Sequence, residues 1–387
     1  MNYSGKILVC QDSLMFGGHE RMFLSLAPGL LALDRLDSLV FCVPSVNKSF
    51  LDALDVAALP RSRIRHLSST KGRGEPYCAP FRYGYRREME AVISEEKPDL
   101  VLLLQGRIEN ALVPMLAAHR AGIPIVSYIP MAHATAELGY RFGTPVLPRI
   151  LDGIRSYYYR LPRGYVVPSA AVERQLRSHG VTARINVVPN VVGVPTAPLS
   201  RAAARAKLQI EPDGRLAVFV GRIDRHQKGL DLLVDAMARL RPETSAWRFA
   251  FVGDGPDASW LRAALDAAGL LPRCRLIRWT DTPGDWYAAS DVVMMPSRFE
   301  GVPLTMMEAL LHERPVLGSE IDVFLDYLPR QGLTRFDGTL DLDAALDRAC
   351  RASEDGHYAP AIAQVRAECD LATSRRLFAE AIDRVLP

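Results

Sequence analysis

Residues 215–240 read RLAVFVGRIDRHQKGLDLLVDAMARL, and this stretch decides the fold. After its first arginine come five apolar residues, a run typical of a buried β-strand. A loop bounded by Gly221 and Gly229 follows, and apolar residues then recur at helical spacing from Leu230 to Leu240. A strand that passes through a glycine loop into a helix is the repeating unit of a parallel α/β sheet.

The same alternation of strand-like and helix-like runs extends in both directions from this stretch. On the C-terminal side the strand-like runs are 247–252, 275–279, 291–295 and 315–317. On the N-terminal side they are 6–10, 38–43, 99–105, 124–129 and 165–167. Because parallel strands need crossover helices, each side predicts a doubly wound α/β sheet. A chain of 387 residues, of which 49% are hydrophobic, is long enough for two such domains.

A proline-rich stretch at 189–198 shows neither strand nor helix spacing and is the best candidate linker. We expect an N-terminal Rossmann-like domain over residues 1–190 and a C-terminal one over residues 199–370. The last segment, about 371–387, has apolar residues at helical spacing, and we expect it to pack back on the N-terminal domain. Open α/β sheets bind ligands beyond the carboxyl ends of their strands, so chemistry is expected in the strand-to-helix loops.

The loop from Gly221 to Gly229 has the features of a diphosphate site. Its glycines let the backbone approach a ligand, Arg222 and Lys228 supply two cations, and a helix N-terminus follows at once. The alternative is that both cations are ordinary charges of a solvated loop.

The run Gly253-Asp254-Gly255, with Ala258, fits the G-x-G-x-x-A dinucleotide fingerprint, and Asp281 lies at the distance of a ribose acid. This pattern supports an alternative class, a nicotinamide-dependent dehydrogenase. The fingerprint normally occupies the first strand-to-helix turn of its domain, whereas here it follows the second predicted strand.

Two glutamates, Glu300 and Glu308, follow the predicted strand 291–295. In a fully helical segment they would lie on the order of 12 Å apart, a span that suits a sugar at one end and a ribose at the other. The competing interpretation of Glu308 is structural, because Thr305-Met306-Met307-Glu308 matches a capping box in which the glutamate closes its own helix.

The order and spacing of these motifs resemble the donor-domain signature of glycosyltransferase family 4, which has the GT-B fold. The residues that carry the resemblance are Gly221-Arg222, Lys228-Gly229, Val252 to Pro256, Glu300-Gly301, Glu308 and Arg314-Pro315-Val316. Residues 17–21 (GGHER) are similar to the family's N-terminal glycine loop, and residues 187–191 (VVPNV) to its interdomain stretch. The resemblance covers nearly the whole chain and implies two doubly wound domains that face each other across a cleft.

The family resemblance implies a role for each matched residue. Arg222 and Lys228 hold the donor diphosphate, Glu300 the transferred sugar, and Glu308 the ribose. His133 lies near the position where the family often has a histidine beside the sugar, and it joins Glu300, Arg222 and Lys228 as a catalytic candidate. The remaining donor-binding candidates are Gly17, Gly18, Gly221, Gly253, Gly255, Trp279, Thr280, Gly301, Val302, Pro303 and Leu304, with Trp279 and Thr280 receiving the base.

The resemblance also implies an activity: transfer of a sugar from a UDP- or GDP-sugar to an acceptor hydroxyl, with retention, in bacterial polysaccharide or glycolipid assembly. Cationic and helix-end groups can stabilise a leaving diphosphate without a metal, so we expect no metal and no cofactor beyond the nucleotide sugar. Asp341-Leu342-Asp343 matches a metal-binding D-x-D, but its place before a helical run favours a helix start. A sugar-nucleotide epimerase of the same fold is the second candidate, ahead of the dehydrogenase.

Charge is distributed unevenly between the two halves. Residues 1–190 hold 23 Lys and Arg against 16 Asp and Glu, and the rest hold 24 against 28. Five arginines between Arg141 and Tyr165, at 141, 149, 155, 160 and 163, alternate with aromatic residues and a single acid. This stretch suits either an anionic membrane surface and a lipid-linked acceptor or an ordinary solvated face.

No signal-peptide or membrane-spanning run is evident in the sequence, so we expect a cytoplasmic protein, with peripheral association on the inner face of the plasma membrane as an open option. The expected partners are a nucleotide-sugar donor and a sugar or lipid-linked sugar acceptor, and no nucleic acid. The six cysteines form no C-x-x-C pair and are expected to be reduced thiols.

Overall fold

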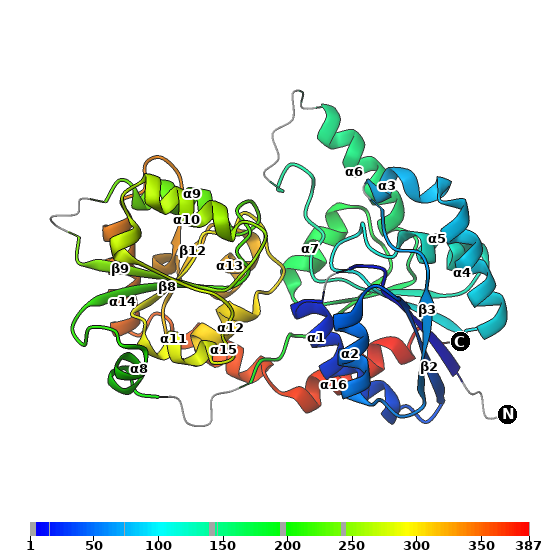
Figure 1. The fold of residues 1–387 in the computed structure, drawn as a ribbon. Coiled ribbons are helices and arrows are strands. Elements are labelled where there is room, and N and C mark those ends of the chain that lie inside the picture. The colour runs from blue at the N-terminus through cyan, green and yellow to red at the C-terminus, as the bar shows by residue number, and fades with distance from the viewer. Residues whose placement is uncertain are drawn as a thin grey trace. The chain divides into compact units, whose positions relative to one another are not determined.

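The computed structural model describes residues 5–14, 16–72, 74–138, 144, 146–193, 199–240 and 245–386. The chain divides into two compact units, each drawn with its own sheet in Figure 1. Unit 1 comprises residues 1–136, 140–191 and 370–387, and unit 2 comprises residues 137–139 and 192–369. The last helix of the chain therefore belongs to unit 1.

Unit 1 is built on a seven-stranded parallel sheet in the order β3-β2-β1-β4-β5-β6-β7. Its strands are β1 (Gly5–Cys10), β2 (Leu36–Pro44), β3 (Ser62–Leu67), β4 (Leu100–Leu104), β5 (Ile125–Tyr128), β6 (Gly164–Val167) and β7 (Arg184–Val187). Its helices are α1 (Gly18–Leu26), η1 (Ala27–Ala32), α2 (Lys48–Ala57), α3 (Glu75–Cys78), η2 (Ala79–Phe81), α4 (Tyr83–Glu96), α5 (Leu112–Arg120), α6 (Val146–Tyr159), α7 (Ala170–Ser178) and α16 (Leu371–Asp383).

Unit 2 repeats the plan with a six-stranded parallel sheet in the order β10-β9-β8-β11-β12-β13. Its strands are β8 (Arg215–Val220), β9 (Trp247–Val252), β10 (Cys274–Ile277), β11 (Val292–Met295), β12 (Val316–Ser319) and β13 (Leu333–Thr334). Its helices are α8 (Arg201–Leu208), α9 (Leu230–Met237), α10 (Ala258–Ala267), η3 (Leu271–Arg273), α11 (Pro283–Ala289), α12 (Leu304–Leu311), α13 (Asp322–Tyr327), η4 (Arg330–Gly332), α14 (Leu342–Glu354) and α15 (Ala359–Glu368).

Both sheets are covered by helices on both faces. In unit 2, α9, α10 and α14 cover one face of the sheet, and α8 and α11 pack on the other. In unit 1, α4, α5 and α7 cover one face, while α1 and α16 lie on the opposite face. There the ring of Phe378 contacts Phe23 and Tyr128 at centroid distances of 6.0 and 5.6 Å. Strands buried on both faces explain the nearly continuous apolar runs in the sequence.

The predicted fold class, two doubly wound α/β sheets, is confirmed. All the strand-like runs that the sequence predicted are strands, but three further strands were not predicted. Two of these, β3 and β7, lie at the edges of the first sheet and are only partly buried. Their basic residues, Arg63, Arg65 and Arg184, interrupt the apolar pattern, because an edge strand needs no continuous apolar face. The third, β13, has only two residues.

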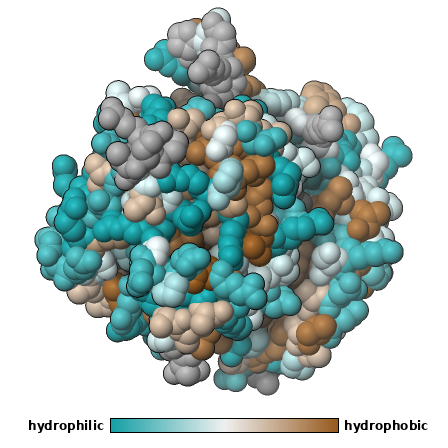
Figure 2. Space-filling view, turned by 60° about the vertical axis from the view of Figure 1, so that its left-hand side comes forward, coloured by the Kyte–Doolittle hydropathy of each residue, from teal (hydrophilic) through white to brown (hydrophobic). Residues whose placement is uncertain are grey.

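No helix in the described parts of the chain has both the length and the apolar character needed to cross a bilayer. On the face drawn in Figure 2, hydrophilic side chains cover most of the surface, and hydrophobic ones gather in separate patches between them.

Candidate functional site

Unit 2 has its topological switch point between β8 and β11. These strands are neighbours in the sheet: the chain continues from β8 to β9 and β10 on one side of this point, and from β11 to β12 and β13 on the other. The loop after β8, residues 221–229, and the loop after β11, residues 296–303, therefore leave the sheet side by side at its carboxyl edge. The predicted cation loop and the predicted Glu300 loop therefore come together. Open α/β sheets bind their ligands at this position.

Close backbone packing holds the two loops against each other. Gly229 has φ +61°, and a Cβ placed on it would lie 2.0 Å from the carbonyl oxygen of Pro296. The Arg298 amide donates to the carbonyl oxygen of Gln227 at 2.9 Å. The Arg298 guanidinium also makes a bidentate ion pair with Asp231 of α9, with N–O distances of 2.7 and 2.8 Å. The relative position of the two loops is thus set by contacts on both backbone and side chains.

Lys228 and Glu300 form an ion pair across the switch point. Lys228 Nζ lies 2.5 Å from Glu300 Oε1, and the Ser297 hydroxyl donates to the same oxygen at 2.7 Å. The side chains of Lys228 and Glu300 are only 14% and 5% exposed. The structure therefore brings together one predicted phosphate ligand and the predicted sugar ligand.

Arg222 lies on the same loop but nearer to solvent. Its guanidinium donates to Gln227 Oε1 at 2.7 Å and lies 3.1 Å from Asp224 Oδ2, and its side chain is 39% exposed. Both contacts are within the loop, so they orient the guanidinium without burying it.

Two predicted glycines, Gly253 and Gly255, serve backbone packing. Gly253, with φ +144°, would place a Cβ 1.9 Å from the carbonyl oxygen of Gly221, and a Cβ on Gly255 would lie 2.3 Å from that of Ile223. The loop after β9 therefore lies directly on the loop after β8, and only glycine permits this approach. Since the G-x-G run follows the second strand of unit 2, it does not occupy the usual position of a dinucleotide fingerprint.

Glu308 lies on α12 and contacts α11. The Tyr287 hydroxyl donates to Glu308 Oε2 at 2.8 Å. Burial raises the pKa of Glu308 above its ordinary value, and the hydrogen bond from Tyr287 opposes this rise. The capping-box interpretation is wrong: α12 begins at Leu304 with Pro303 as its N-cap, so Thr305 lies inside the helix and Glu308 faces Tyr287 instead of the helix start.

The residues from Gly301 to Leu304 form the entry into α12. Gly301, Val302 and Pro303 are buried, and among the described residues no side chain caps this helix. The first-turn N–H groups and the positive end of the helix dipole favour an anion at this end. The Glu300 loop leads directly into this turn.

Trp279 and Thr280 follow β10. Trp279 is 67% exposed, and its indole N–H donates to Asp281 Oδ1 at 3.3 Å. The hydroxyls of Thr280 and Thr282 are 3.4 Å apart. This loop offers an exposed aromatic face at the same carboxyl edge of the sheet.

Gly17 and Gly18 lie in unit 1 at the start of α1. The Glu20 carboxylate accepts a hydrogen bond from the Gly17 amide at 2.9 Å, so this N–H is already used within the helix end. His19, to which we assigned no role, stacks on Tyr128 at 4.4 Å, and burial lowers its pKa to about 4.

His133, the fourth catalytic candidate, also lies in unit 1 and is buried. Its carbonyl oxygen accepts a hydrogen bond from Arg155, and the preceding residue, Ala132, is held through its amide by Gln175 and through its carbonyl by His179. The backbone at His133 is thus fixed by three side chains.

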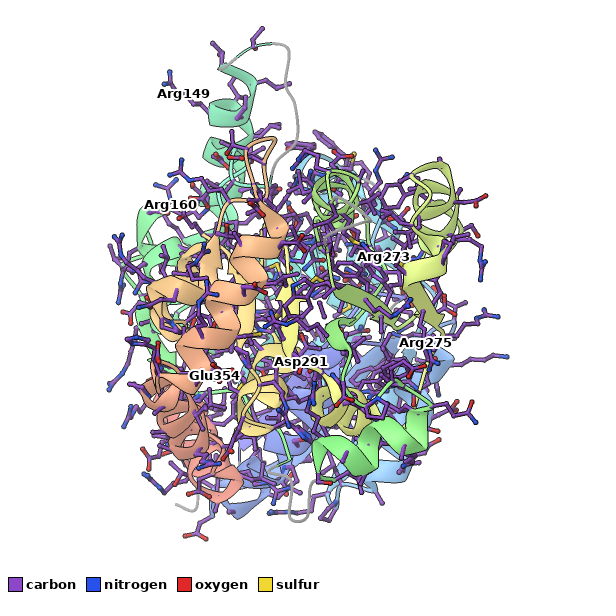
Figure 3. All side chains as sticks on the ribbon, turned by 90° about the vertical axis from the view of Figure 1, so that its left-hand side faces the viewer. Arg149, Arg160, Arg273, Arg275, Asp291 and Glu354 are labelled. Carbon is purple, nitrogen blue, oxygen red and sulfur yellow. The ribbon has the colours of Figure 1, made fainter. Side chains whose placement is uncertain are left out.

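The basic stretch at 141–165 is less exposed than the sequence suggested. Arg155 is buried, with ion pairs to Glu109 and Asp152, and Tyr158 and Tyr159 are core residues. The expectation that Arg155 and the tyrosines of this stretch all lie on the surface was therefore wrong for Arg155, Tyr158 and Tyr159. Arg149 on α6, Arg160 directly after this helix, and Arg163 are exposed, and Figure 3 labels the first two. Arg141 lies outside the described residues.

Asp341 confirms the helix-start interpretation of the D-x-D run. It is the N-cap of α14, and its carboxylate accepts from the Ala344 amide at 3.0 Å. Asp343 accepts from the Ser245 hydroxyl. The described residues include no group of three or more His, Cys, Asp or Glu placed to hold a metal ion.

Sequence reasoning missed Tyr287, Ser297, Arg298 and Asp231, which position the predicted residues. Ser297 and Arg298 lie between the predicted strand 291–295 and Glu300, so their proximity to Glu300 in the sequence was the available signal. Tyr287 is 21 positions from Glu308 in the sequence, and Asp231, although it lies just after the cation loop, is 67 positions from Arg298, so only the packing of α11 and α9 reveals these contacts.

Solved structures share this fold over the whole chain. Anabaena HepE, in a complex with UDP, matches with a TM-score of 0.72 at 17% identity over 98% of this chain and 100% of that one. Sucrose-phosphate synthase from Thermosynechococcus elongatus matches with a TM-score of 0.73 at 16% identity over 98% of both chains. These matches show the fold of the chain, which is the GT-B fold of the two α/β sheets described above.

Two family models match the sequence, one in each half. Glycosyltransferase Family 4 matches residues 16–194, and Glycosyl transferases group 1 matches residues 214–340. Together they span most of the chain, which belongs to glycosyltransferase family 4.

Curated relatives match over shorter lengths. The lipopolysaccharide core biosynthesis mannosyltransferase LpsB of Rhizobium meliloti is 31% identical over 196 residues, which is 46% of this chain and 55% of that protein. A sulfoquinovosyl transferase of Arabidopsis thaliana is 30% identical over 265 residues, or 63% of this chain and 47% of that protein. The match thus spans about half the length of these relatives.

Proposed function

We propose that this protein transfers a sugar from a nucleotide-diphosphate sugar to an acceptor hydroxyl. The observation that carries the proposal is the Lys228–Glu300 ion pair at the switch point of unit 2. In this proposal Lys228 is a cation for a phosphate and Glu300 a carboxylate for sugar hydroxyls, and the two side chains are in direct contact. Family membership supports a transferase, and no finding supports the epimerase or the dehydrogenase.

In this proposal, Arg222, Lys228 and the first turn of α12 bind the diphosphate. Negative charge grows on the leaving phosphate as the anomeric bond breaks. Donors held in place before the reaction stabilise this charge, and the loss of one typically costs about 10²- to 10³-fold in rate. The packed glycines at 221 and 253 hold the loop that carries both cations in position.

Glu300 and Glu308 bind the two ends of the donor in this proposal. Glu300 accepts from hydroxyls of the transferred sugar, and its orientation is fixed by Lys228 and Ser297. Glu308 accepts from ribose hydroxyls and is oriented by Tyr287. Trp279 and Thr280 offer the base a surface to stack against. Transfer with retention, without a metal or a further cofactor, completes the proposed chemistry.

Unit 1 binds the acceptor in this proposal, and Gly18 and His133 are its candidate ligand-contacting residues. The relatives point to an acceptor class: LpsB is named for lipopolysaccharide core biosynthesis, and a Bacillus subtilis relative for teichuronic acid biosynthesis. We infer a role in bacterial polysaccharide or glycolipid assembly, with a sugar or lipid-linked sugar as the acceptor.

Helix α6 supports a peripheral contact with an anionic membrane. Val146, Leu147 and Ile150 are 55%, 43% and 54% exposed, and Arg149 lies among them. Exposed apolar side chains beside a cation favour the interface of an anionic bilayer, where each cation contributes about 1 kcal/mol.

Donor binding and turnover test the proposed activity. We expect UDP or GDP, and one of their sugars, to raise the melting temperature, with UDP the first choice because HepE was solved with UDP-glucose. Glu300→Ala and Lys228→Ala should abolish turnover. Lys207→Ala is the matched control, since Lys207 forms a 2.7 Å ion pair with Asp285 in the same unit outside the site. Full activity in either site variant would refute the assignment.

Liposome flotation tests the membrane contact separately. We expect flotation with anionic vesicles and its loss in a Leu147→Glu, Ile150→Glu variant. Val56→Glu is the control, because Val56 is an exposed apolar residue on α2 of the same unit. Equal recovery with and without anionic lipid would dismiss the membrane contact.

A further inference from the structure

A second cationic pocket lies in unit 2 at the end of the sheet opposite the candidate site. It opens where β8, β9 and β10 begin, whereas the loops described above follow the ends of these strands. Its volume is about 340 Å³, within the range of small-molecule sites. We call it the strand-start pocket.

Four arginines line this pocket: Arg215, Arg248, Arg273 and Arg275. They come from the starts of three adjacent strands and the turn before β10, and Figure 3 labels the last two. Among the described residues that line the pocket, Glu211 is the single carboxylate. The lining is therefore strongly cationic.

The contacts of Arg248 and Arg275 with carbonyl oxygens leave the charge of these two side chains uncompensated. Arg275 donates to the carbonyl oxygens of Leu208 and Gln209 at 2.6 and 2.5 Å, and Arg248 to that of Pro272 at 3.4 Å. A carbonyl oxygen orients a guanidinium but carries no negative charge. Arg215 differs, since it pairs with Asp347. A guanidinium has five N–H donors, so Arg248 and Arg275 keep donors for a ligand.

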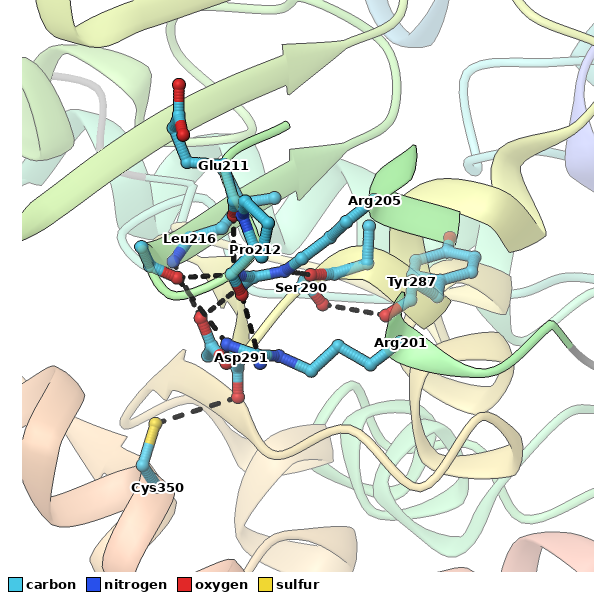
Figure 4. Close-up of polar contacts among 11 residues, drawn as sticks. Arg201, Arg205, Glu211, Pro212, Leu216, Tyr287, Ser290, Asp291 and Cys350 are labelled. Atoms are coloured by element: carbon cyan, nitrogen blue, oxygen red, sulfur yellow. Dashed lines mark hydrogen bonds and ion pairs between the residues drawn. The ribbon is translucent and has the colours of Figure 1, made fainter. Parts of the chain in front are cut away.

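The opposite wall of the pocket is held rigidly by a buried arginine. Arg205, 1% exposed, donates to the carbonyl oxygens of Glu211, Pro212 and Gly214 at 3.0, 2.8 and 2.5 Å. It also pairs with Asp291 at 2.8 Å, so the loop 211–214 is tied to the start of β11, as Figure 4 shows. A wall fixed in this way loses little conformational freedom when a ligand binds.

We propose that the strand-start pocket binds a small phosphorylated anion, independently of the donor site. The planar guanidinium forks of Arg248 and Arg275 match phosphate oxygens, and arginine is the side chain that most often binds phosphate in this way. The pocket's apolar contributors, Ile210 and Pro272 among them, can contact a small organic group beside the phosphate. The ligand is either a soluble phosphorylated compound or a phosphate-bearing lipid headgroup.

Isothermal titration of the full chain with inorganic pyrophosphate tests the proposal. Four proteins separate the two sites: wild type, an Arg222→Gln, Lys228→Gln variant, an Arg248→Gln, Arg275→Gln variant, and the combination of all four changes. We expect wild type to bind at two sites, each double variant at one, and the combination at none. Each of the two substitutions, Arg248→Gln and Arg275→Gln, should weaken pyrophosphate binding at the strand-start pocket by about 10-fold or more.

Controls separate specific binding from general charge and from misfolding. Arg262→Gln removes an exposed charge on α10 away from the pocket and should leave both sites intact. The four tryptophans all lie in unit 2, so their fluorescence reports whether each variant retains the native fold of this unit. Sedimentation with vesicles that contain phosphatidic acid distinguishes a lipid headgroup from a soluble ligand. If the protein sediments with the vesicles and this depends on Arg248 and Arg275, the ligand is a headgroup. If the protein does not sediment with them, the ligand is a soluble compound.

Unchanged stoichiometry in the folded Arg248→Gln, Arg275→Gln variant would overturn this proposal, as would an equal loss in Arg262→Gln. Unchanged stoichiometry in the Arg222→Gln, Lys228→Gln variant would instead count against the donor-site assignment.

Discussion

Replacing Lys228 with methionine should both destabilise unit 2 and stop turnover, and the structure gives the size of the first effect. Glu300 is 5% exposed on its side chain, so removal of the ammonium 2.5 Å away leaves a buried carboxylate without its cation. Breaking a buried pair from one side costs about 3–5 kcal/mol. Because the Ser297 hydroxyl still donates to Glu300, we expect the lower end, about 3 kcal/mol.

The opposite change, Glu300→Gln, should cost less. Lys228 is 14% exposed and can turn its ammonium toward water, so about 1–2 kcal/mol is expected. The double variant, Lys228→Met with Glu300→Gln, leaves no unpaired charge. Its loss should therefore fall below the sum of the two single losses by at least about 1 kcal/mol.

Urea unfolding followed by tryptophan fluorescence measures these losses in unit 2 alone. Trp247, Trp260, Trp279 and Trp286 are the four tryptophans of the chain, and all of them belong to unit 2. Lys207→Met is the control, since Lys207 is 54% exposed and its ion pair should contribute less than about 1 kcal/mol. Additive losses in the double variant, or a Lys228→Met protein as stable as wild type, would refute the argument from burial.

Three further predictions follow from single contacts. Tyr287→Phe removes a hydrogen bond that lowers the pKa of Glu308, so the acid limb of kcat/KM for the donor should move to higher pH; an unmoved limb would separate Glu308 from donor binding. Burial raises the pKa of Asp12 to about 7, so folding favours its protonated form, and stability present below about pH 4 is lost as pH rises through 7. Asp12→Asn should remove this loss, which in wild type amounts to about 3 kcal/mol between pH 5 and pH 8 when unfolding is followed by far-UV circular dichroism. Gly253→Ala should destabilise unit 2 by more than about 2 kcal/mol, because its Cβ would lie 1.9 Å from a carbonyl oxygen, while Gly338→Ala, with open space around it, should not.

The central strands were predictable because burial on both faces leaves a continuous apolar signature. The run at 100–104 is entirely apolar and entirely buried. Edge strands carry no such signature: β3 mixes arginine and histidine with isoleucine and leucine, and only its last residue, Leu67, is fully buried. Their pairing depends on backbone hydrogen bonds to a neighbour that lies far away in the sequence, so no local pattern could reveal it.

The site could be predicted only as far as its separate loops. The glycine loop at 221–229 and the segment at 300–308 each have a local pattern, but their meeting at Lys228 and Glu300 follows from strand order, since the partners are 72 positions apart in the sequence. The same limit applies to Glu308, whose spacing from Thr305 fits a cap. Whether Glu308 caps its helix depended on where α12 begins and on the hydrogen bond from Tyr287. Helix boundaries are the feature that a local sequence predicts least reliably.

The two ends of the proposed donor site should respond to different solution conditions. At the phosphate end, attraction between the donor and Arg222, which is 39% exposed, is screened by salt, so donor affinity should fall as ionic strength rises. At the ribose end, Glu308 is oriented by a neutral hydroxyl and its pKa is raised by burial, so donor affinity should instead fall as the solution becomes acidic. Donor KM measured against salt at pH 8, and against pH at constant ionic strength, separates the two effects. Tyr287→Phe should alter only the pH series and Arg222→Gln chiefly the salt series; if both variants changed both series alike, the two ends would not act independently.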